Sequence, residues 1–548
     1  MTTKLVLQRK VVAVPQVSLL DIRLHLGLAT LVGLFLRTWG VADAPPGLNQ
    51  DEAVYAYDAF SIWKTGRDHL GHPFPFASLE TFGDWSSPLL TYLSIPAIAI
   101  FGLRVEVIRI VAALIGAAAI PLVFCLGALV LKRPSIGLSA AWAIALLPCA
   151  VHLSRWAIIP TVVPTMIAAT CLALMWALEN RSSRGIVLAA LLAALTVASY
   201  HSMKVYVPLI CVAALVVYWR QLIRIPLEAL AYASVLFLAI AGPIFWLSAR
   251  DPGGGARVAQ TSVFNTHDFS FGLMVDQYSA YFSPALWFVR GDQNPMHLPP
   301  GQGLLPWALA PLVFAGLIWL AYNVIREPSA PLRRVSYFLT AAIVLYPIPG
   351  AFTLPNPHVL RAVHILPLAA LAAGIGMGVT IDYIRSESAR LRSPTMVRSL
   401  VAALFLILVL GAVELSNRYD RYFGEYPREV AEEFHYGMGE ALAYVKMIEA
   451  DYDEVWIRHQ NSAYIYVLFY REWDPSDVHR NLVVRRNPPD WNVVESIGRF
   501  HFGDAPGFQR QETLFMTYEP SGVPAYEVVA GSSAGGRTLV IEDRRHSP

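Results

Sequence analysis

Two adjacent carboxylates, Asp51 and Glu52, stand in the segment GLNQDEAVYAYDAF, directly after a Pro-Pro-Gly turn at residues 45–47. The segment opens a predicted helix, and a carboxylate at a helix N-terminus is favoured by the unpaired N–H groups and by the helix dipole. A carboxylate in this place can also act as a general base that accepts the proton of an attacking hydroxyl group. The local sequence leaves both interpretations open.

Cationic side chains occur in three later segments: HLSRWAIIP (residues 152–160), SYHSMK (199–204) and PNPHVLRAVH (355–364). Snorkelling towards lipid headgroups would explain any one of these cations. However, the fork of an arginine and the point charge of a lysine both suit phosphate oxygens, so several cations on one side of a membrane favour a shared anionic ligand. The predicted ligand-binding residues are Arg155, Lys204 and Arg361, accompanied by His201, His358 and His364.

No metal site is predicted. The three histidines are spread over two loops, and each alone is explained by packing. The four cysteines all lie inside apolar runs, which is typical of small buried residues and argues against a disulfide framework. Tyr55 could stack on the face of a sugar ring or could belong to the aromatic belt of a membrane interface.

The elements that must position these residues are membrane helices. The chain of 548 residues is 55% hydrophobic and only 15% charged, whereas soluble chains are about 25% charged. Apolar runs of about twenty residues, the length that crosses a bilayer, recur along the chain. The eleven predicted spans are Ile22–Val41, Val105–Leu131, Ile136–Val151, Thr161–Leu178, Ile186–Tyr200, Val205–Trp219, Leu227–Leu247, Leu304–Asn323, Val335–Phe352, Ala362–Tyr383 and Val397–Leu415.

Basic residues predict the orientation, because cytoplasmic loops are enriched in Lys and Arg. If the short apolar piece Pro88–Phe101 lies in the interface without crossing, five basic loops and the basic N-terminus fall on the cytoplasmic side. The first apolar run has no small-residue cleavage site, so we expect it to be a retained first helix and not a removed signal peptide. The basic residues are Lys4, Arg9, Lys10, Lys132, Arg133, Arg181, Arg184, Arg220, Arg224, Arg326, Arg333, Arg334, Arg385, Arg390 and Arg392.

Two domains are predicted. Residues 1–416 form an α-helical polytopic membrane module, with a first outer loop at residues 42–104. Residues 417–548 are more polar and form an extracytoplasmic soluble α/β domain: DEVWIRH, TLFMTY and RTLVIED read as strands, and Glu429–Glu449 reads as a helix. The net charge is only +2, so no nucleic-acid partner is expected.

The chain resembles the C-type (GT-C) glycosyltransferase superfamily, in particular the protein O-mannosyltransferases and the lipid A aminoarabinose transferase. The resemblance covers about residues 20–415 and rests on the order of GLNQDEAVYAYDAF, GDWSSPLLTYLSIPAIAIFG followed by LRVEVIRIV, HLSRWAIIP and SYHSMKVYVPL. It implies a GT-C fold, an outer-face active site in the first loop, juxtamembrane helices, and inverting transfer of a sugar from a polyprenyl- or dolichyl-phosphate carrier.

By this resemblance the catalytic acid is Asp51, with Glu52 as its neighbour. Arg155 matches the arginine of the family's Ser-Arg segment, and Lys204 matches a lysine that contacts the carrier phosphate in the aminoarabinose transferase. Two departures concern the acceptor and the phosphate site. Pro160 stands where family members often have a second acid, and Ser86 or Ser87 stands where a basic residue or histidine often precedes the proline.

The resulting hypothesis is a multi-pass membrane glycosyltransferase, hexosyl or pentosyl, with a polyprenyl-phosphate sugar as donor. Its acceptor is a protein, a lipid or a polysaccharide. Asp51 deprotonates the acceptor, while the cations stabilise the departing phosphate without a metal or other cofactor. The alternative is a transporter or flippase of lipid-linked glycans, which also has many spans and buried charges. The lack of a repeat relating two halves and the position of the charges at the outer ends of the spans count against this alternative.

Overall fold

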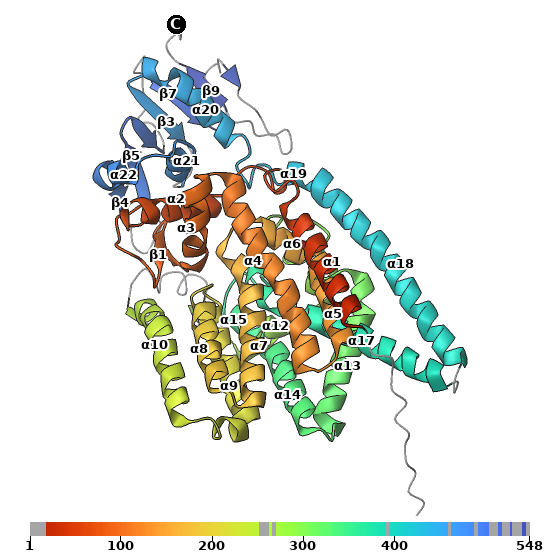
Figure 1. Cartoon of the computed structure of the whole chain (residues 1–548). Helices are drawn as coiled ribbons and strands as arrows, with labels where there is room; N and C mark the ends of the chain where they lie inside the picture. The colour runs from red at the N-terminus through yellow and green to blue at the C-terminus, as the bar shows by residue number, and fades with distance from the viewer. Residues whose placement is uncertain are drawn as a thin grey trace, which may run out of the picture.

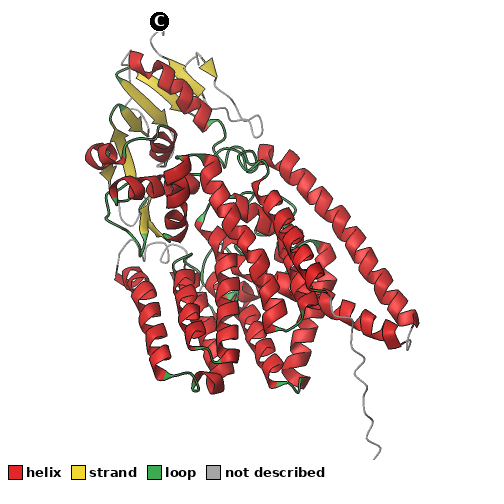
Figure 2. Ribbon diagram, viewed as in Figure 1, coloured by secondary structure: helices red, strands yellow, loops and turns green. Residues whose placement is uncertain are grey.

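The computed structural model describes residues 18–250, 262–265, 270–390, 394–458, 462–486, 492–503, 513–517, 527–528 and 540–543. These residues form a bundle of long helices, with a smaller part built around a β-sheet at one end of the bundle (Figures 1 and 2). The predicted class, a polytopic helical membrane protein with a C-terminal α/β part, is confirmed. The basic N-terminus with Lys4, Arg9 and Lys10, and Arg392, lie outside the described residues.

A helix occupies each of the eleven predicted spans. Eight helical stretches of the described chain are long and apolar enough to cross a membrane, and a bent pair gives a ninth. Helices α8 and α14 have only 15 and 16 residues, fewer than the roughly twenty that a bilayer requires, so the exact number of spans stays a prediction. The helices are α1 (Leu19–Thr38), α4 (Val105–Cys125), α5 (Pro134–Leu146), α7 (Val163–Asn180), α8 (Ser183–Val197), α9 (Met203–Leu222), α10 (Leu227–Arg250), α13 (Ala310–Arg326), α14 (Ala330–Leu345), α17 (Leu366–Arg390) and α18 (Pro394–Gly424).

The bent pair differs from the continuous span predicted at Ile136–Val151. Helix α5 ends at Leu146, and α6 (Pro148–Arg155) continues at an angle of 56°. Leu147 has extended backbone angles, because the ring of Pro148 disfavours the helical conformation of the residue before it. The bend gives residues 148–155 a helix of their own.

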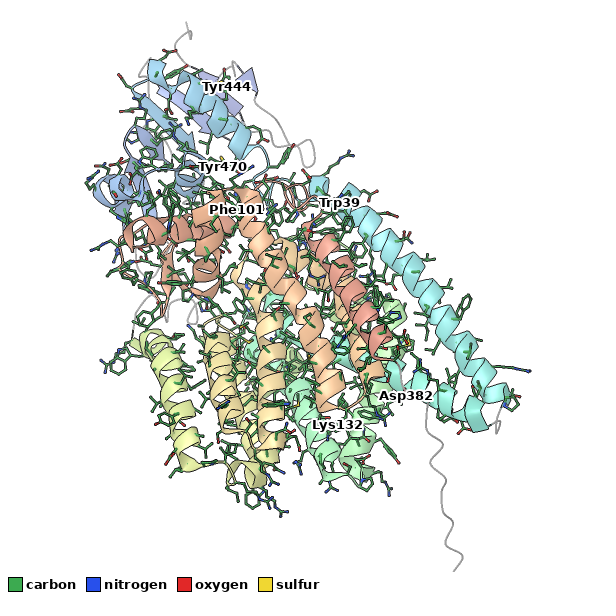
Figure 3. The ribbon with its side chains drawn as sticks, in the orientation of Figure 1. Trp39, Phe101, Lys132, Asp382, Tyr444 and Tyr470 are labelled. Atoms are coloured by element: carbon green, nitrogen blue, oxygen red, sulfur yellow. The ribbon has the colours of Figure 1, made fainter. Side chains whose placement is uncertain are left out.

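The predicted cytoplasmic loops gather at the end of the bundle that faces away from the sheet. Arg334 at the start of α14 pairs with Glu179 at the end of α7 at 2.7 Å, and Arg133 lies 3.4 Å from Asp382 of α17. Lys132 and Asp382 lie towards this end, whereas Trp39 and Phe101 lie towards the sheet (Figure 3). The loops therefore group as predicted, while the side of the membrane that they face stays a prediction.

The first outer loop is folded. It contains α2 (Gln50–Thr65), a hairpin of β1 (Leu79–Thr81) and β2 (Asp84–Ser86), and α3 (Leu89–Phe101). Helix α3 has 13 residues, which is too short to cross a bilayer. Helices α2 and α3 lie at the end of the bundle next to the sheet (Figure 1).

The C-terminal sheet has seven strands in the order β4-β5-β6-β3-β7-β9-β8. Strand β3 runs parallel to β6 and β7, and the other pairs are antiparallel. Strands β3, β7 and β9 lie in the three segments predicted as strands. The strands are β3 (Glu454–Arg458), β4 (Val483–Arg485), β5 (Val493–Ile497), β6 (Phe500–Phe502), β7 (Thr513–Thr517), β8 (Glu527–Val528) and β9 (Val540–Asp543).

Three helices pack with this sheet: α20 (Met438–Ile448), α21 (Ala463–Tyr470) and α22 (Pro475–Asn481). The helix predicted at Glu429–Glu449 is interrupted, because Gly437 has φ +90° and starts α20 as its N-cap. The boundary predicted at residue 416 lies within α18. One hydrophobic cluster contains residues of α2 and α3 together with residues of α20, α21 and β3, so the first outer loop and the C-terminal part share a core.

Candidate active site

Helix α2 begins at a closely packed turn. Gly47 has φ +60°, and a Cβ at this position would lie 2.3 Å from the carbonyl oxygen of Phe434, so only glycine fits. Asn49 is the N-cap: its side chain accepts from the backbone N of Asp51 at 2.9 Å, and Glu52 accepts from the backbone N of Asn49 at 3.1 Å. This capping box places Asp51 in the first turn of the helix.

Glu52 is fully buried, and both of its carboxylate oxygens are occupied. Oε1 accepts from Arg109 Nε at 2.8 Å and from the backbone N of Ala157 at 3.0 Å. Oε2 accepts from Arg109 Nη2 at 2.8 Å and from Asn49 N. Taking up a proton would break a buried ion pair. These contacts anchor α2 on α4 through Glu52, while the catalytic role predicted for Glu52 stays a prediction.

Asp51 meets a different environment. It follows Gln50 in the first turn of α2 and is partly exposed, whereas Glu52 is not. The capping box and the Arg109 pair fix the backbone of this turn. Asp51 is therefore the more exposed carboxylate of the pair.

Arg155 lies at the end of α6, directly beneath the first outer loop. Its guanidinium donates to four carbonyl oxygens, those of Leu36, Trp39, Gly40 and Ala44, at 2.6–3.0 Å. Its planar face lies 5.0 Å from the Phe423 ring. The prediction that Arg155 holds a phosphate is not supported, because its donors already bind the end of α1 and the chain that leads to α2.

Lys204 lies at the start of α9, at the end of the bundle next to the sheet. Its Nζ donates to Ser248 Oγ of α10 at 2.7 Å, and Asp84 of the β1–β2 hairpin is close enough to attract its charge. The side chain is mostly buried. The structure thus brings Lys204 to the first outer loop, on the same side as Asp51.

Arg361 follows a loop that contains two cis prolines, Pro355 and Pro357. Its guanidinium donates to Thr353 Oγ1 at 2.8 Å, to Leu354 O at 3.0 Å and to Pro355 O at 3.2 Å. Part of its hydrogen-bonding capacity therefore holds its own loop, and the side chain remains partly exposed.

The predicted aromatic and histidine residues have mixed positions. Tyr55 is only 3% exposed, and its hydroxyl donates to Ser86 Oγ at 3.4 Å, so it is a core residue rather than an open stacking surface. His201 is partly exposed and packs beside Tyr200 at 5.9 Å. His364 is fully buried, with its Nε2 3.0 Å from Tyr346 O.

His358 belongs to a cluster that the sequence did not reveal. Its ring lies 4.7 Å from the ring of His297, and His297 Nδ1 lies 2.6 Å from Asp292 Oδ2. Burial alone would raise the pKa of Asp292, but the hydrogen bond from His297 brings it below its usual value. One ligand atom from each of the three side chains lies within 4.8 Å of the others, so the group could hold a metal ion.

Contacts connect this cluster to both sides of the candidate site. Asn49, the cap of α2, has its Nδ2 3.8 Å from the sulfur of Met296, the neighbour of His297. The backbone N of His358 donates to the hydroxyl of Tyr281 at 3.2 Å, and the charge of Arg361 acts on the same hydroxyl. The start of α2 and the Arg361 loop therefore meet the same segment of chain.

Sequence reasoning missed three residues that build the site: Arg109, His297 and Asp292. Arg109 carried a usable signal, because a charged residue inside an apolar span is rare and needs a partner. The five-residue spacing of Asp292 and His297 in GDQNPMH has no such signal, because a single histidine in a loop is common.

A cavity of about 820 Å³ lies elsewhere, among α1, α5, α13, α17 and α18. Its lining is almost entirely apolar, apart from a few side chains that include Asp21, His25 and Arg385. None of the predicted site residues lines it, so it is separate from the candidate active site.

No protein-family model matches the sequence, and no curated protein matches it. Solved structures do match. ArnT from Cupriavidus metallidurans bound to undecaprenyl phosphate is similar over 95% of this chain and 98% of that chain, with a TM-score of 0.54 and 12% sequence identity. The apo oligosaccharyltransferase of Archaeoglobus fulgidus is similar over 82% of this chain and 63% of that chain, with a TM-score of 0.50 and 14% identity. At this identity the similarity shows the fold, which is the GT-C fold that the sequence motifs predicted.

Proposed function

We propose that this protein is an integral membrane glycosyltransferase that transfers a sugar from a polyprenyl-phosphate carrier to an acceptor. The fold that it shares with ArnT, described in complex with undecaprenyl phosphate, supports this proposal. The observation that carries it is the contrast between two adjacent carboxylates. Glu52 is buried and saturated with donors, which fixes the first turn of α2 and presents the partly exposed Asp51.

Asp51 is the general base of the proposed reaction. It accepts the proton of an acceptor O–H or N–H group while that oxygen or nitrogen attacks the anomeric carbon of the donor. The bond from the anomeric carbon to the carrier phosphate breaks, and its electron pair leaves with the phosphate. Attack from the face opposite the phosphate inverts the anomeric centre.

The phosphate contacts of this proposal fall to Lys204 and Arg361, with His201 and His358 nearby in the same loops. Arg155 is left out, because its guanidinium donates to four carbonyls. Charged donors held in place before the reaction stabilise a departing phosphate without moving. We therefore propose that the transfer is independent of a metal.

The reaction side in this proposal is extracytoplasmic. The basic loops at the opposite end of the bundle support this orientation, with the C-terminal sheet on the same side as the reaction. The sugar, hexose or pentose, and the acceptor, a protein, lipid or polysaccharide, are open within the proposal.

The test is a transfer assay with purified protein in liposomes, supplied with labelled polyprenyl-phosphate hexoses and pentoses and a panel of acceptors. We expect product glycoside from the native protein and a loss of about 100-fold or more in Asp51→Asn, because general bases contribute about 10²–10⁴-fold. Asp43→Asn, an exposed carboxylate in the same loop, is the matched control and should keep its rate. Near-normal turnover of Asp51→Asn would rule out its role, and carrier translocation without product would favour a flippase.

A further inference from the structure

A row of three buried polar side chains joins the first outer loop to the C-terminal sheet. Asp58 of α2 accepts from the backbone N of His69 at 2.9 Å, and its Oδ1 lies 2.7 Å from His69 Nδ1. His69 Nε2 lies 3.0 Å from the hydroxyl of Tyr464 in α21. The exposed fractions of the three residues are 0%, 0% and 2%. All three side chains are therefore removed from bulk water.

The row is costly to bury. The second carboxylate oxygen of Asp58 has no hydrogen-bond partner among the described residues, and burial raises the pKa of this group. Burial alone would lower the pKa of His69, but the charge of Asp58 raises it. Buried polar groups that are incompletely satisfied are unfavourable, and a network of them specifies one arrangement of the elements that carry it.

Other direct bonds surround the row and cross the same boundary. The Tyr57 hydroxyl donates to the carbonyl of Trp473 at 2.6 Å. His479 Nε2 lies 2.7 Å from the carbonyl of Asp68. Glu80 of β1 accepts from Asn492 Nδ2 at 2.7 Å. These bonds hold α2, the loop that follows it and the β1–β2 hairpin against the C-terminal part.

The row acts on the helix that carries the proposed base. Asp58 lies seven residues after Asp51, which places the two carboxylates about two turns and about 10 Å apart on one face of α2. Arg109 holds the first turn of α2 from the bundle side through Glu52. The Tyr464 row holds the middle of the same helix from the sheet side (Figure 1 shows α2 between the bundle and α21).

We propose that Tyr464, acting through His69 and Asp58, is a positioning residue with which the C-terminal sheet domain sets the place of α2, and so of Asp51, in the transferase site. The consequence for catalysis rests on the proposed function. The positioning of α2 by Tyr464 does not depend on that function, because the conformational order of α2 can be measured without substrate.

The experiment compares Tyr464→Phe with Tyr466→Phe in the full-length protein. Both variants lose one hydroxyl group from α21, but the Tyr466 hydroxyl bonds His435, outside α2, at 2.9 Å. Hydrogen–deuterium exchange of residues 50–65 is measured in detergent or nanodiscs. The transfer assay gives kcat and the KM for the donor. For Tyr464→Phe we expect exchange of residues 50–65 to rise about tenfold and kcat to fall about tenfold with KM unchanged. Tyr466→Phe should change neither. If Tyr464→Phe does not fold, His69→Gln takes its place in the experiment. The glutamine side chain cannot reach both Asp58 and Tyr464, so we expect the same rise in exchange and the same fall in kcat.

Each failure has its own signature. Unchanged exchange of residues 50–65 in both Tyr464→Phe and His69→Gln would overturn the inference, whatever the activity. Equal loss of kcat in Tyr464→Phe and Tyr466→Phe would also overturn it, because the effect would then be general. A native protein that transfers no sugar would count against the proposed function, and the exchange measurement would still test the positioning of α2.

Discussion

Glu52 and Arg109 form an ion pair in which both side chains are 0% exposed. Removing one partner of such a pair leaves the other charge uncompensated in the interior and costs about 3–5 kcal/mol. We expect Glu52→Ala to lower the free energy of unfolding by this amount, measured as a lower melting temperature by tryptophan fluorescence. Glu106→Ala, at a side chain 47% exposed in the helix of Arg109, is the control and should change it by less than about 0.5 kcal/mol. A Glu52→Ala protein that melts like the native one would restore Glu52 as a catalytic candidate.

The sequence singled out Asp51 and Lys204 as site residues, which stays a prediction, but it could not assign roles to Glu52 and Arg155. A sequence does not show whether a charged side chain such as Glu52 or Arg155 contacts a substrate or holds other parts of the protein. Their hydrogen-bond partners in the structure define their roles. Arg155 donates to four carbonyl oxygens. Glu52 accepts from Arg109 and from two backbone N–H groups. These partners are 57 to 119 residues away or belong to a cap, and no local pattern encodes them.

Helices were the most predictable elements, because a long apolar run in a membrane must satisfy its backbone internally. All eleven predicted spans contain a helix. The bend at Leu147 follows from Pro148, which the sequence displays, whereas the break before α20 depends on the positive φ of Gly437. The structure inside the first outer loop was harder to predict from the sequence, because strands β1 and β2 have only three residues each.

The loops that carry Asp292, His297 and His358 lead to a prediction about metals. Asp292 Oδ2 already accepts from the backbone N of Val359 at 2.7 Å and lies 2.6 Å from His297 Nδ1, so hydrogen bonds of Asp292 join the two loops. We expect sugar transfer to continue at the native rate after dialysis against EDTA, and addition of Zn²⁺, Mn²⁺ or Mg²⁺ not to increase it. Activity that is lost on chelation and restored by one ion would contradict metal independence. Loss of that ion from His297→Ala would then locate it.

At the scale of the whole molecule, the two predicted domains are not independent. The first outer loop and the C-terminal part share one hydrophobic cluster, and the bonds between them join residues about 400 apart in the chain, such as His69 and Tyr464. Sequence patterns report the period of an element and not its distant partner. The composition change after residue 416 therefore predicted a separate domain, while its docking on α2 had no local signal.

This docking should depend on pH. The pKa of His69 is raised above its usual 6.5 by Asp58 and despite burial, and that of His72, which faces Asp68 and Glu80, is raised as well. A raised pKa means that the folded state binds the proton more tightly, so the stability it contributes is complete below pH 6.5 and is lost as pH rises through the folded value. The raised pKa of Asp58 also makes the folded state less stable as pH rises. The lowered pKa of Asp68 changes the stability only at acid pH. We expect the melting temperature to fall as pH rises above 6.5, and the fall to be smaller in His69→Gln. A melting temperature that is level over this range, or the same slope in His69→Gln, would show that the buried pair does not titrate with unfolding.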